Sequence, residues 1–275
     1  MDLRPVEEDA RGIIDPATGL ARFRLDRHPP SPALARFVDR HWVATWDLTG
    51  REPFTQRVLA HPVVNLVFTA GTATVHGPAA GPVGRRLDGR GWALGVMFRP
   101  AGFRPFADRP LHALIDTSLP AGEALPGGEE LERAVRDLDP GDPDAVAPLL
   151  ARVEDFLAAL APADPHPAEG TRDIVERVAA DPTTLGVADL AAREGLGVRL
   201  LQRRFADHVG PGPKSVIRRY RFYEAAERAR RGTPPDWGRL AAELGFSDQA
   251  HLTREFTALI GVPPGRYAAR ARAGR

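Results

Sequence analysis

The chain has 275 residues, a length that favours two domains, each large enough to bury a core of its own. It contains no Cys, which excludes disulfides, thiolate nucleophiles and Cys-ligated zinc sites, and its net charge is +1. No apolar run of about 18 residues could span a bilayer, and the N-terminal residues lack the pattern of a secretion signal. We therefore expect a cytoplasmic protein that does not bind membranes.

Short apolar runs that alternate with Gly and Pro mark the first half of the chain. They lie at 57–60, 63–68, 73–76 and 92–98. This pattern is typical of the strands and turns of a small β-sheet or barrel. After Phe103 the pattern becomes helical, with apolar residues at Leu131, Val135 and Leu138 and again between Leu149 and Leu160. The fold class predicted for residues 1–165 is α+β, a β-rich domain that also contains helices.

Histidines and aromatic residues in this half are the candidates for a binding site. His41, His61 and His76 follow neither a His-x-His nor a His-Glu-x-x-His spacing, so ordinary polar or core roles are favoured over metal binding. The candidates for lining a pocket, with two arginines that could meet an acid group, are Trp42, Trp46, Phe68, Trp92, Phe98, Arg57 and Arg99. For the aromatic residues a core role is favoured. We predict no catalytic residue, no cofactor and no metal, and we expect that the chain is not an enzyme.

A Pro-rich stretch at 161–170 divides the chain into parts of opposite charge. It is a natural domain boundary and predicts domains at 1–165 and 166–275. Residues 171–275 hold 19 Lys and Arg against 12 Asp and Glu, a net charge of +7, while residues 1–170 hold 18 against 24, a net charge of −6. This asymmetry points to a polyanion as the partner of the basic part. The alternative is that the arginines only decorate solvated helix faces.

Two stretches near the C-terminus repeat one another. Residues 190–197 read Leu-Ala-Ala-Arg-Glu-Gly-Leu-Gly, and residues 240–247 read Leu-Ala-Ala-Glu-Leu-Gly-Phe-Ser. The offset is 50 from Leu190 to Leu240 and 51 from Phe205 to Phe256. The two repeats thus match on both sides of a turn in which the second has one additional residue. This is expected when the copies of a duplicated unit diverge in sequence. The repeat predicts two helix-turn-helix units, at about 187–209 and 237–260.

Local signals place the helices within each unit. Gly195 suits the end of the first helix because this position often needs a left-handed conformation. The second helix starts near Gly197 in the first unit, and in the second unit Ser247 is a strong N-cap with Asp248 in the first turn. The apolar stripes expected to face inward are Leu200, Leu201, Phe205 and Val209 in the first unit and Leu252, Phe256 and Ile260 in the second.

The polar residues opposite these stripes are suited to reading DNA. Arg makes two hydrogen bonds to guanine and Gln two to adenine in the major groove, and an Ala methyl group meets the thymine methyl. The residues predicted to contact double-stranded DNA are Arg199, Gln202, Arg203, Gln249, Ala250, Thr253 and Arg254. Phosphate contact or solvent exposure is the alternative for each polar side chain.

A longer helix is predicted at 213–231, between the two units. It begins at a proline, which a first turn tolerates, and stops before a Gly-Thr-Pro-Pro segment. At 1.5 Å per residue such a helix is about 27 Å long. It can therefore hold two reading helices about one DNA turn apart on one face of the duplex.

The region 171–270 resembles the DNA-binding domain of the AraC/XylS family of transcriptional regulators. The resemblance is carried by the duplicated unit, by Arg-Phe-Tyr-Glu-Ala-Ala at 221–226, and by Gly-Phe-Ser-Asp-Gln at 245–249 followed by Gly-Val-Pro-Pro-Gly-Arg-Tyr at 261–267. It implies an all-α domain in which the seven residues named above face bases. The family usually has a capping residue where this chain has Gly197, so we hypothesise that the second unit is the better ordered.

The first half resembles a β-rich domain of unknown function that precedes AraC-type DNA-binding domains. The resemblance rests on His-Pro-Val-Val-Asn-Leu-Val-Phe at 61–68 and Val-Met-Phe-Arg-Pro-Ala-Gly at 96–102. It implies a cupin-like sensor or dimerisation module and identifies no ligand.

Together these features predict a cytoplasmic bacterial transcription regulator that binds specific DNA sequences and responds to a small-molecule or protein effector at its N-terminal domain. Attraction between the acidic and the basic half could mask the DNA-binding face. Two alternatives stay open, a cupin-like metal-dependent enzyme fused to a DNA-binding module, and a DNA-binding architectural protein. The sequence also leaves open the effector, the operator, activation or repression, a contact with RNA polymerase and the formation of a homodimer.

Overall fold

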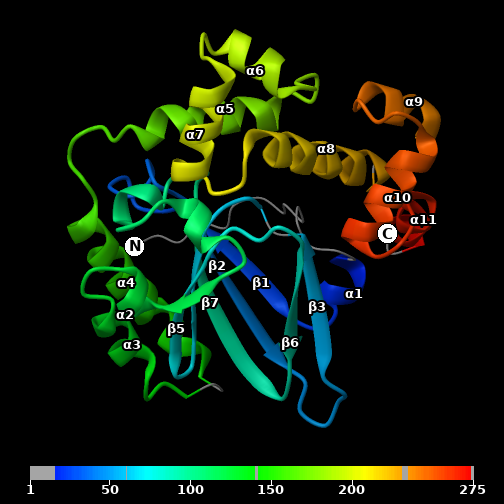
Figure 1. Cartoon of the computed structure of the whole chain (residues 1–275). Helices are drawn as coiled ribbons and strands as arrows, with labels where there is room; N and C mark the ends of the chain where they lie inside the picture. The colour runs from blue at the N-terminus through cyan, green and yellow to red at the C-terminus, as the bar shows by residue number, and fades with distance from the viewer. Residues whose placement is uncertain (1–15, 60, 140–141, 231–234, 274–275) are drawn as a thin grey trace.

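The computed structural model describes residues 16–59, 61–139, 142–230 and 235–273. The first part of the chain, up to residue 160, holds a six-stranded sheet of order β1-β2-β7-β4-β5-β8 and a two-stranded sheet of β3 and β6 (Figure 1). All paired strands are antiparallel. The strands are β1 (Arg24–His28), β2 (Val38–Asp47), β3 (Phe54–Leu59), β4 (Asn65–Thr69), β5 (Thr72–His76), β6 (Pro82–Leu87), β7 (Arg90–Phe98) and β8 (Ser118–Pro120).

Helices lie beside the six-stranded sheet and complete its core. The helices are α1 (Pro16–Leu20), before β1, and α2 (Ala121–Ala124), α3 (Glu129–Val135) and α4 (Val146–Leu160), after β8. Three short 3-10 helices are Arg104–Phe106, Leu111–Leu114 and Pro143–Ala145. Leu131 of α3 and Val153 of α4 share one apolar core with Phe68, Trp92 and Phe98 of the sheet. The predicted α+β class and the core role of these three aromatic residues are confirmed.

Trp42 and Trp46 also serve packing. In the register of β2 and β7 they lie opposite Gly95 and Gly91. A Cβ built on Gly95 would come within 2.0 Å of the Trp42 ring, and one built on Gly91 within 2.5 Å of the Trp46 ring. The rings therefore fill the space that the two glycines leave on the surface of the sheet.

The second part of the chain is all helical. Its helices are α5 (Ala168–Ala180), α6 (Val187–Arg193), α7 (Val198–His208), α8 (Pro213–Arg230), α9 (Trp237–Glu243), α10 (Gln249–Ile260) and α11 (Pro264–Ala273). The joining helix ends at Arg230, and Arg231, its predicted last residue, lies outside the described residues. Figure 1 shows α6 and α7 at one end of α8, and α9 and α10 at the other. None of the described helices is long and apolar enough to cross a membrane.

Two separate apolar cores explain this arrangement. Val216 and Ile217 of α8 pack in one core with Leu201 and Phe205, and Phe222 and Ala225 of the same helix pack in another with Leu252 and Phe256. The helix α8 thus contributes residues to the apolar cores of both units.

The Pro-rich stretch between the two parts is held against the first part. Arg36 donates from Nη1 to the carbonyl of Ala163 at 3.1 Å and from Nη2 to that of Asp164 at 3.1 Å. The last three residues of the stretch, 168–170, form the first turn of α5 rather than a linker. The two parts are therefore joined by a tethered segment.

Candidate nucleic-acid interface

The two predicted turns have the same backbone geometry. Gly195 has φ +64° and Gly245 has φ +69°. In the first turn the N–H of Leu196 donates to the carbonyl of Ala191 at 2.8 Å, and in the second the N–H of Phe246 donates to that of Ala241 at 2.9 Å. These bonds close each first helix with a left-handed glycine, which a side chain would strain. The left-handed conformation expected at Gly195 is confirmed. Gly245, the corresponding residue of the second unit, has the same conformation.

The buried faces of the two units also correspond. Ala191 and Ala241 are 2% and 0% exposed, which fits a close crossing of the paired helices. The buried stripe residues are Leu201, Phe205 and Val209 in the first unit and Leu252, Phe256 and Ile260 in the second. Leu200, which was placed in the first stripe, is only half-buried. These stripes fix which face of α7 and of α10 is turned outward.

The N-cap of α10 differs from the prediction. The helix begins at Gln249, and the capping residue is Asp248, whose Oδ1 accepts from the N–H of His251 at 2.6 Å. The hydroxyl oxygen of Ser247 instead lies 3.0 Å from Nδ1 of the His251 ring. The bond from the His251 N–H is the main cause of the lowered pKa of Asp248. Ser247 and Asp248 are both good capping residues. The Ser247 hydroxyl bonds the His251 ring, and Asp248 caps the helix.

The predicted reading residues lie on the outward faces of α7 and α10. All are exposed except Thr253, which is half-buried. Within the described residues, the guanidinium groups of Arg199, Arg203 and Arg254 make no hydrogen bond and no ion pair. By contrast, Arg193 on α6 pairs with Asp181 at 2.8 Å. The guanidinium groups on the two second helices thus keep their donors available for an external acceptor.

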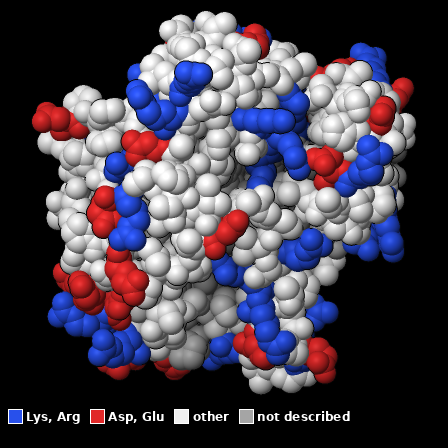
Figure 2. All heavy atoms as spheres, viewed as in Figure 1, with Lys and Arg blue, Asp and Glu red and all other residues white. Residues whose placement is uncertain are grey.

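Charge is distributed unevenly over the face drawn in Figure 2. Acidic and basic side chains are interleaved over the region of α2 to α4, while basic side chains predominate over the C-terminal helices. Exposed basic residues outside the predicted set include Lys214, Arg266 and Arg270. They add cations that a phosphate backbone would attract.

The N-terminal part contributes to the cores of both units. Ala101 packs in the core of the first unit, and Leu59, at the end of β3, packs in that of the second. The hydroxyl of Tyr223 on α8 donates to the carbonyl of Leu59 at 2.6 Å, and the same ring stacks on His61 with centroids 4.6 Å apart. The helical part is therefore packed directly against the sheet domain.

Ion pairs join the first part of the chain to the helical part. The attraction suggested between the acidic half, 1–170, and the basic half, 171–275, would need carboxylates of the former beside basic side chains of the latter. Two pairs across this division have the opposite polarity, Arg99 with Glu176 at 2.7 Å and Arg104 with Asp207 at 2.8 Å. Arg36 pairs with Glu169 at 2.5 Å within the acidic half, in the first turn of α5. The net charges of the two halves therefore do not describe these contacts.

The two arginines considered for an acid ligand also make contacts between the two parts. Nη1 of Arg57 donates to the carbonyl of Ile260 at the end of α10, at 3.2 Å. Arg99 pairs with Glu176 of α5. Both arginines therefore hold the helical part, and the suggestion that they meet an acid ligand stays a prediction.

The three candidate histidines meet three different partners. The buried His41 ring bonds the carboxylate of Glu154 on α4, His61 stacks on Tyr223, and Nδ1 of His76 lies 2.7 Å from the Ser118 hydroxyl. Burial lowers the pKa of His76 to about 4. Within the described ranges, no group of three His, Asp or Glu residues could hold a metal ion.

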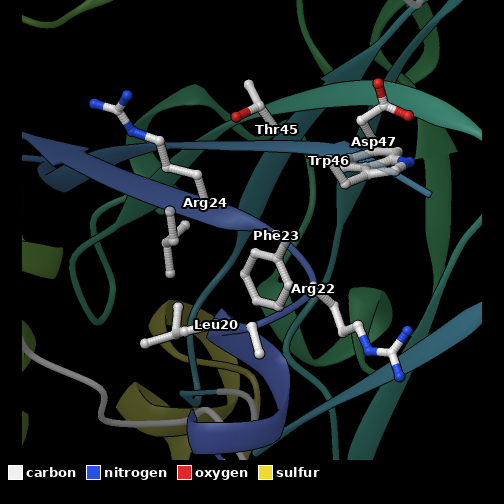
Figure 3. Close-up of a pocket in the computed structure, with 9 residues that line it drawn as sticks. Leu20, Arg22, Phe23, Arg24, Thr45, Trp46 and Asp47 are labelled. Carbon is white, nitrogen blue, oxygen red and sulfur yellow. The ribbon is translucent and has the colours of Figure 1, made fainter. Parts of the chain in front are cut away.

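The hollows among the described residues include two candidates for small-molecule binding. One, of about 460 Å³, lies beside the end of α1, β1 and β2 and includes Trp46 (Figure 3). Its Arg22 and Arg24 point to opposite sides, so they do not converge on one ligand. The other, of about 210 Å³, lies where His61 meets α5 and α8, and its lining includes Tyr220 and Glu227. This second hollow adjoins both parts of the chain.

Comparison with known proteins gives two domain matches. Residues 26–120 match a domain of unknown function (DUF6597), and residues 190–270 match a family described as a helix-turn-helix domain. An AraC-like transcription regulator of Streptomyces lividans is 33% identical over 81 residues, which are 30% of this chain and 26% of that relative. The chain thus matches about a quarter of that relative's length.

Structures of ToxT from Vibrio cholerae are also similar. An apo variant gives a TM-score of 0.41 at 13% identity, covering 84% of this chain and 97% of ToxT. Wild-type ToxT with bound unsaturated fatty acid gives a TM-score of 0.36 at 10% identity, covering 90% of this chain and 91% of ToxT. From its sequence matches and its repeated turns, the chain carries an AraC-type helix-turn-helix domain behind a domain of the DUF6597 family.

Proposed function

We propose that the chain is a sequence-specific transcription regulator that acts on promoter DNA in the cytoplasm and reads two successive major grooves. The observation that carries this proposal is the pair of matching turns at the two ends of α8, each followed by a helix with unpaired, exposed arginines. An arginine with available donors suits guanine in the major groove, whereas an ion-paired one does not.

The dimensions of α8 support the use of both units. Its 18 residues give a length of about 27 Å at 1.5 Å per residue. Successive major grooves on one face of B-DNA lie about 34 Å apart. Because the units extend beyond the helix ends, their second helices can enter neighbouring grooves together.

We assign base contact to seven residues and backbone contact to their neighbours. The base-reading set is Arg199, Gln202, Arg203, Gln249, Ala250, Thr253 and Arg254. Lys214, exposed at the start of α8, is assigned to phosphate. The division into a regulatory domain at 1–165 and a DNA-binding domain at 166–275 belongs to the same proposal.

Control by an effector would act through the boundary between the domains. The first domain contacts both units, through Ala101 and Arg104 on one side and Leu59 and Arg57 on the other. A small molecule or protein that prefers one arrangement of these contacts changes DNA affinity by its differential binding. The hollow of about 210 Å³ between His61 and α8 is a place where such a ligand would meet both domains.

The direct test is selection of DNA sequences by the purified full chain, followed by affinity measurements. We expect a motif with two half-sites. Arg203→Ala and Arg254→Ala should each lose about 1–3 kcal/mol of binding free energy and relax specificity in one half-site. Lys214→Ala is the control and should weaken specific and random duplexes alike. Equal losses on both kinds of duplex for the two Arg variants would refute the assignment.

A further inference from the structure

The segment before the first unit touches the turn of the second. Leu185 lies two positions before the start of α6, and Gly245 is the left-handed glycine between α9 and α10. A Cβ built on Gly245 would lie 3.1 Å from Cδ2 of Leu185. The leucine side chain thus packs against the glycine backbone. The two units contact each other at this point as well as through α8.

Arg221 of α8 lies between the same two groups. Its Nη2 donates to the carbonyl of Leu185, and its Nη1 would lie 3.4 Å from a Cβ on Gly245. Its Nε is buried and has no hydrogen-bond partner among the residues that the structure describes. A guanidinium group is planar and rigid, so a bond at one end also fixes where the other end lies.

The place of Arg221 along α8 adds to this role. Val216 and Ile217 belong to the core of the first unit, and from Phe222 onward α8 belongs to the core of the second. Arg221 is thus at the changeover between the two cores. A contact at this point resists rotation of one unit against the other about the helix axis.

We propose that Arg221, together with Leu185, sets the separation and relative angle of the two reading helices, and so selects the spacing between DNA half-sites. This rests on the proposed function. Arg221 acts as a positioning residue and touches no base. Because each added base pair turns the duplex by about a tenth of a helical turn, a rigid pair of units discriminates spacing sharply and a loosened pair does not.

The test uses the full chain and operators that differ only in the number of base pairs between the half-sites. For the native protein we expect one inserted base pair to weaken binding by about tenfold, as for one mismatched base pair. For Arg221→Ala, and for the uncharged change Leu185→Ser, the penalty should fall below about threefold, with base preferences inside each half-site unchanged. Far-ultraviolet circular dichroism checks that each variant is folded.

Arg218→Ala is the matched control. This residue lies one turn earlier on α8 and pairs with Glu255 of α10 at 2.7 Å, so its loss removes a cation and one ion pair of α8 but leaves Leu185 and Gly245 untouched. It should keep the native spacing penalty. An unchanged penalty in both Arg221→Ala and Leu185→Ser, or an equal decrease in Arg218→Ala, overturns the inference. Failure of the native protein to select paired half-sites would instead refute the proposed function.

Discussion

The two helix-turn-helix units share their turns and buried stripes but differ in how their helices begin. In the second unit, Asp236 accepts from the N–H groups of Gly238 at 2.9 Å and Arg239 at 3.1 Å, and Asp248 accepts from His251. In the first unit both N-cap positions are glycines, Gly186 and Gly197, which have no side chain to accept such a bond. The N-termini of α9 and α10 are therefore capped by side chains of the second unit itself.

The first unit is also held by contacts with the N-terminal part of the chain. Besides the Arg104 pair, Nδ1 of His112 lies 3.3 Å from the carbonyl of Ala206, and a Cβ on Gly210 would lie 2.9 Å from the carbonyl of Leu111. The helices of the first unit thus lack side-chain caps at their N-termini and have contacts with the N-terminal part instead. The comparison teaches that two copies of one motif can be stabilised by different means.

The largest expected effects come from emptying either core. Phe205→Ala and Phe256→Ala each remove a fully buried ring and should destabilise by about 3–5 kcal/mol. Since the two cores are separate, hydrogen exchange should accelerate mainly in α7 for the first change and mainly in α10 for the second. Equal acceleration in both helices for both variants would show that the units do not behave separately.

Loss of the Asp248 cap should have a smaller effect, confined to the second unit. Asp248→Ala leaves the His251 N–H without its acceptor, so exchange at the start of α10 should accelerate while α7 is unchanged. The pKa of Asp248 is lowered in the folded chain. Its stabilising contribution is therefore present above the unfolded pKa of about 3.9 and is lost as the pH falls through the lowered value. Exchange in α10 that is insensitive to this titration would contradict the capping role.

Removing the anchor of the first unit should cost less still. Arg104→Ala breaks the pair with Asp207, a partly exposed contact that contributes about 0.2–1 kcal/mol. We expect faster exchange in α7 without change in α10. Arg152→Ala, which breaks the exposed pair with Glu130 far from both units, is the matched control and should leave α7 as it is. Equal acceleration of exchange in α7 in both variants would show that the Arg104–Asp207 pair does not stabilise the first unit.

The smallest effect should come from supplying the first unit with a cap. Gly197→Asp should stabilise α7 by about 0.3 kcal/mol in the absence of DNA, because Asp is only slightly better than Gly at this position. Hydrogen exchange in α7 should slow, and the difference in protection between α7 and α10 should narrow. Faster exchange in α7 would mean that the missing cap does not limit the first unit.

The helical part could be predicted closely because its determinants are local. The left-handed glycines and the stripes of Phe205 and Phe256 depend on spacing within a few turns, and duplication supplied each signal twice. The N-cap at Asp248 was missed because two adjacent residues could cap, and a ring four residues from Ser247 decided between them.

The first part was harder to predict because its determinants are distant in sequence. The strand β1 reads Arg-Leu-Asp-Arg-His, which has no apolar run, and pairing with β2 defines it. The partner of Arg57 is 203 residues away, so no local pattern indicates that this arginine contacts the helical part. The contact of Leu185 with Arg221 was not predicted either, because these residues meet only when the two units are in place.

The most direct measurement is a hydroxyl-radical and methylation-protection footprint of the native chain on an operator that it selects. We predict two protected stretches about one helical turn apart on one face of the duplex, each with guanine N7 protection that Arg203→Ala or Arg254→Ala removes from its own half alone. A single protected stretch, or protection of the sugar-phosphate backbone with no base protected, would contradict the paired reading of two grooves.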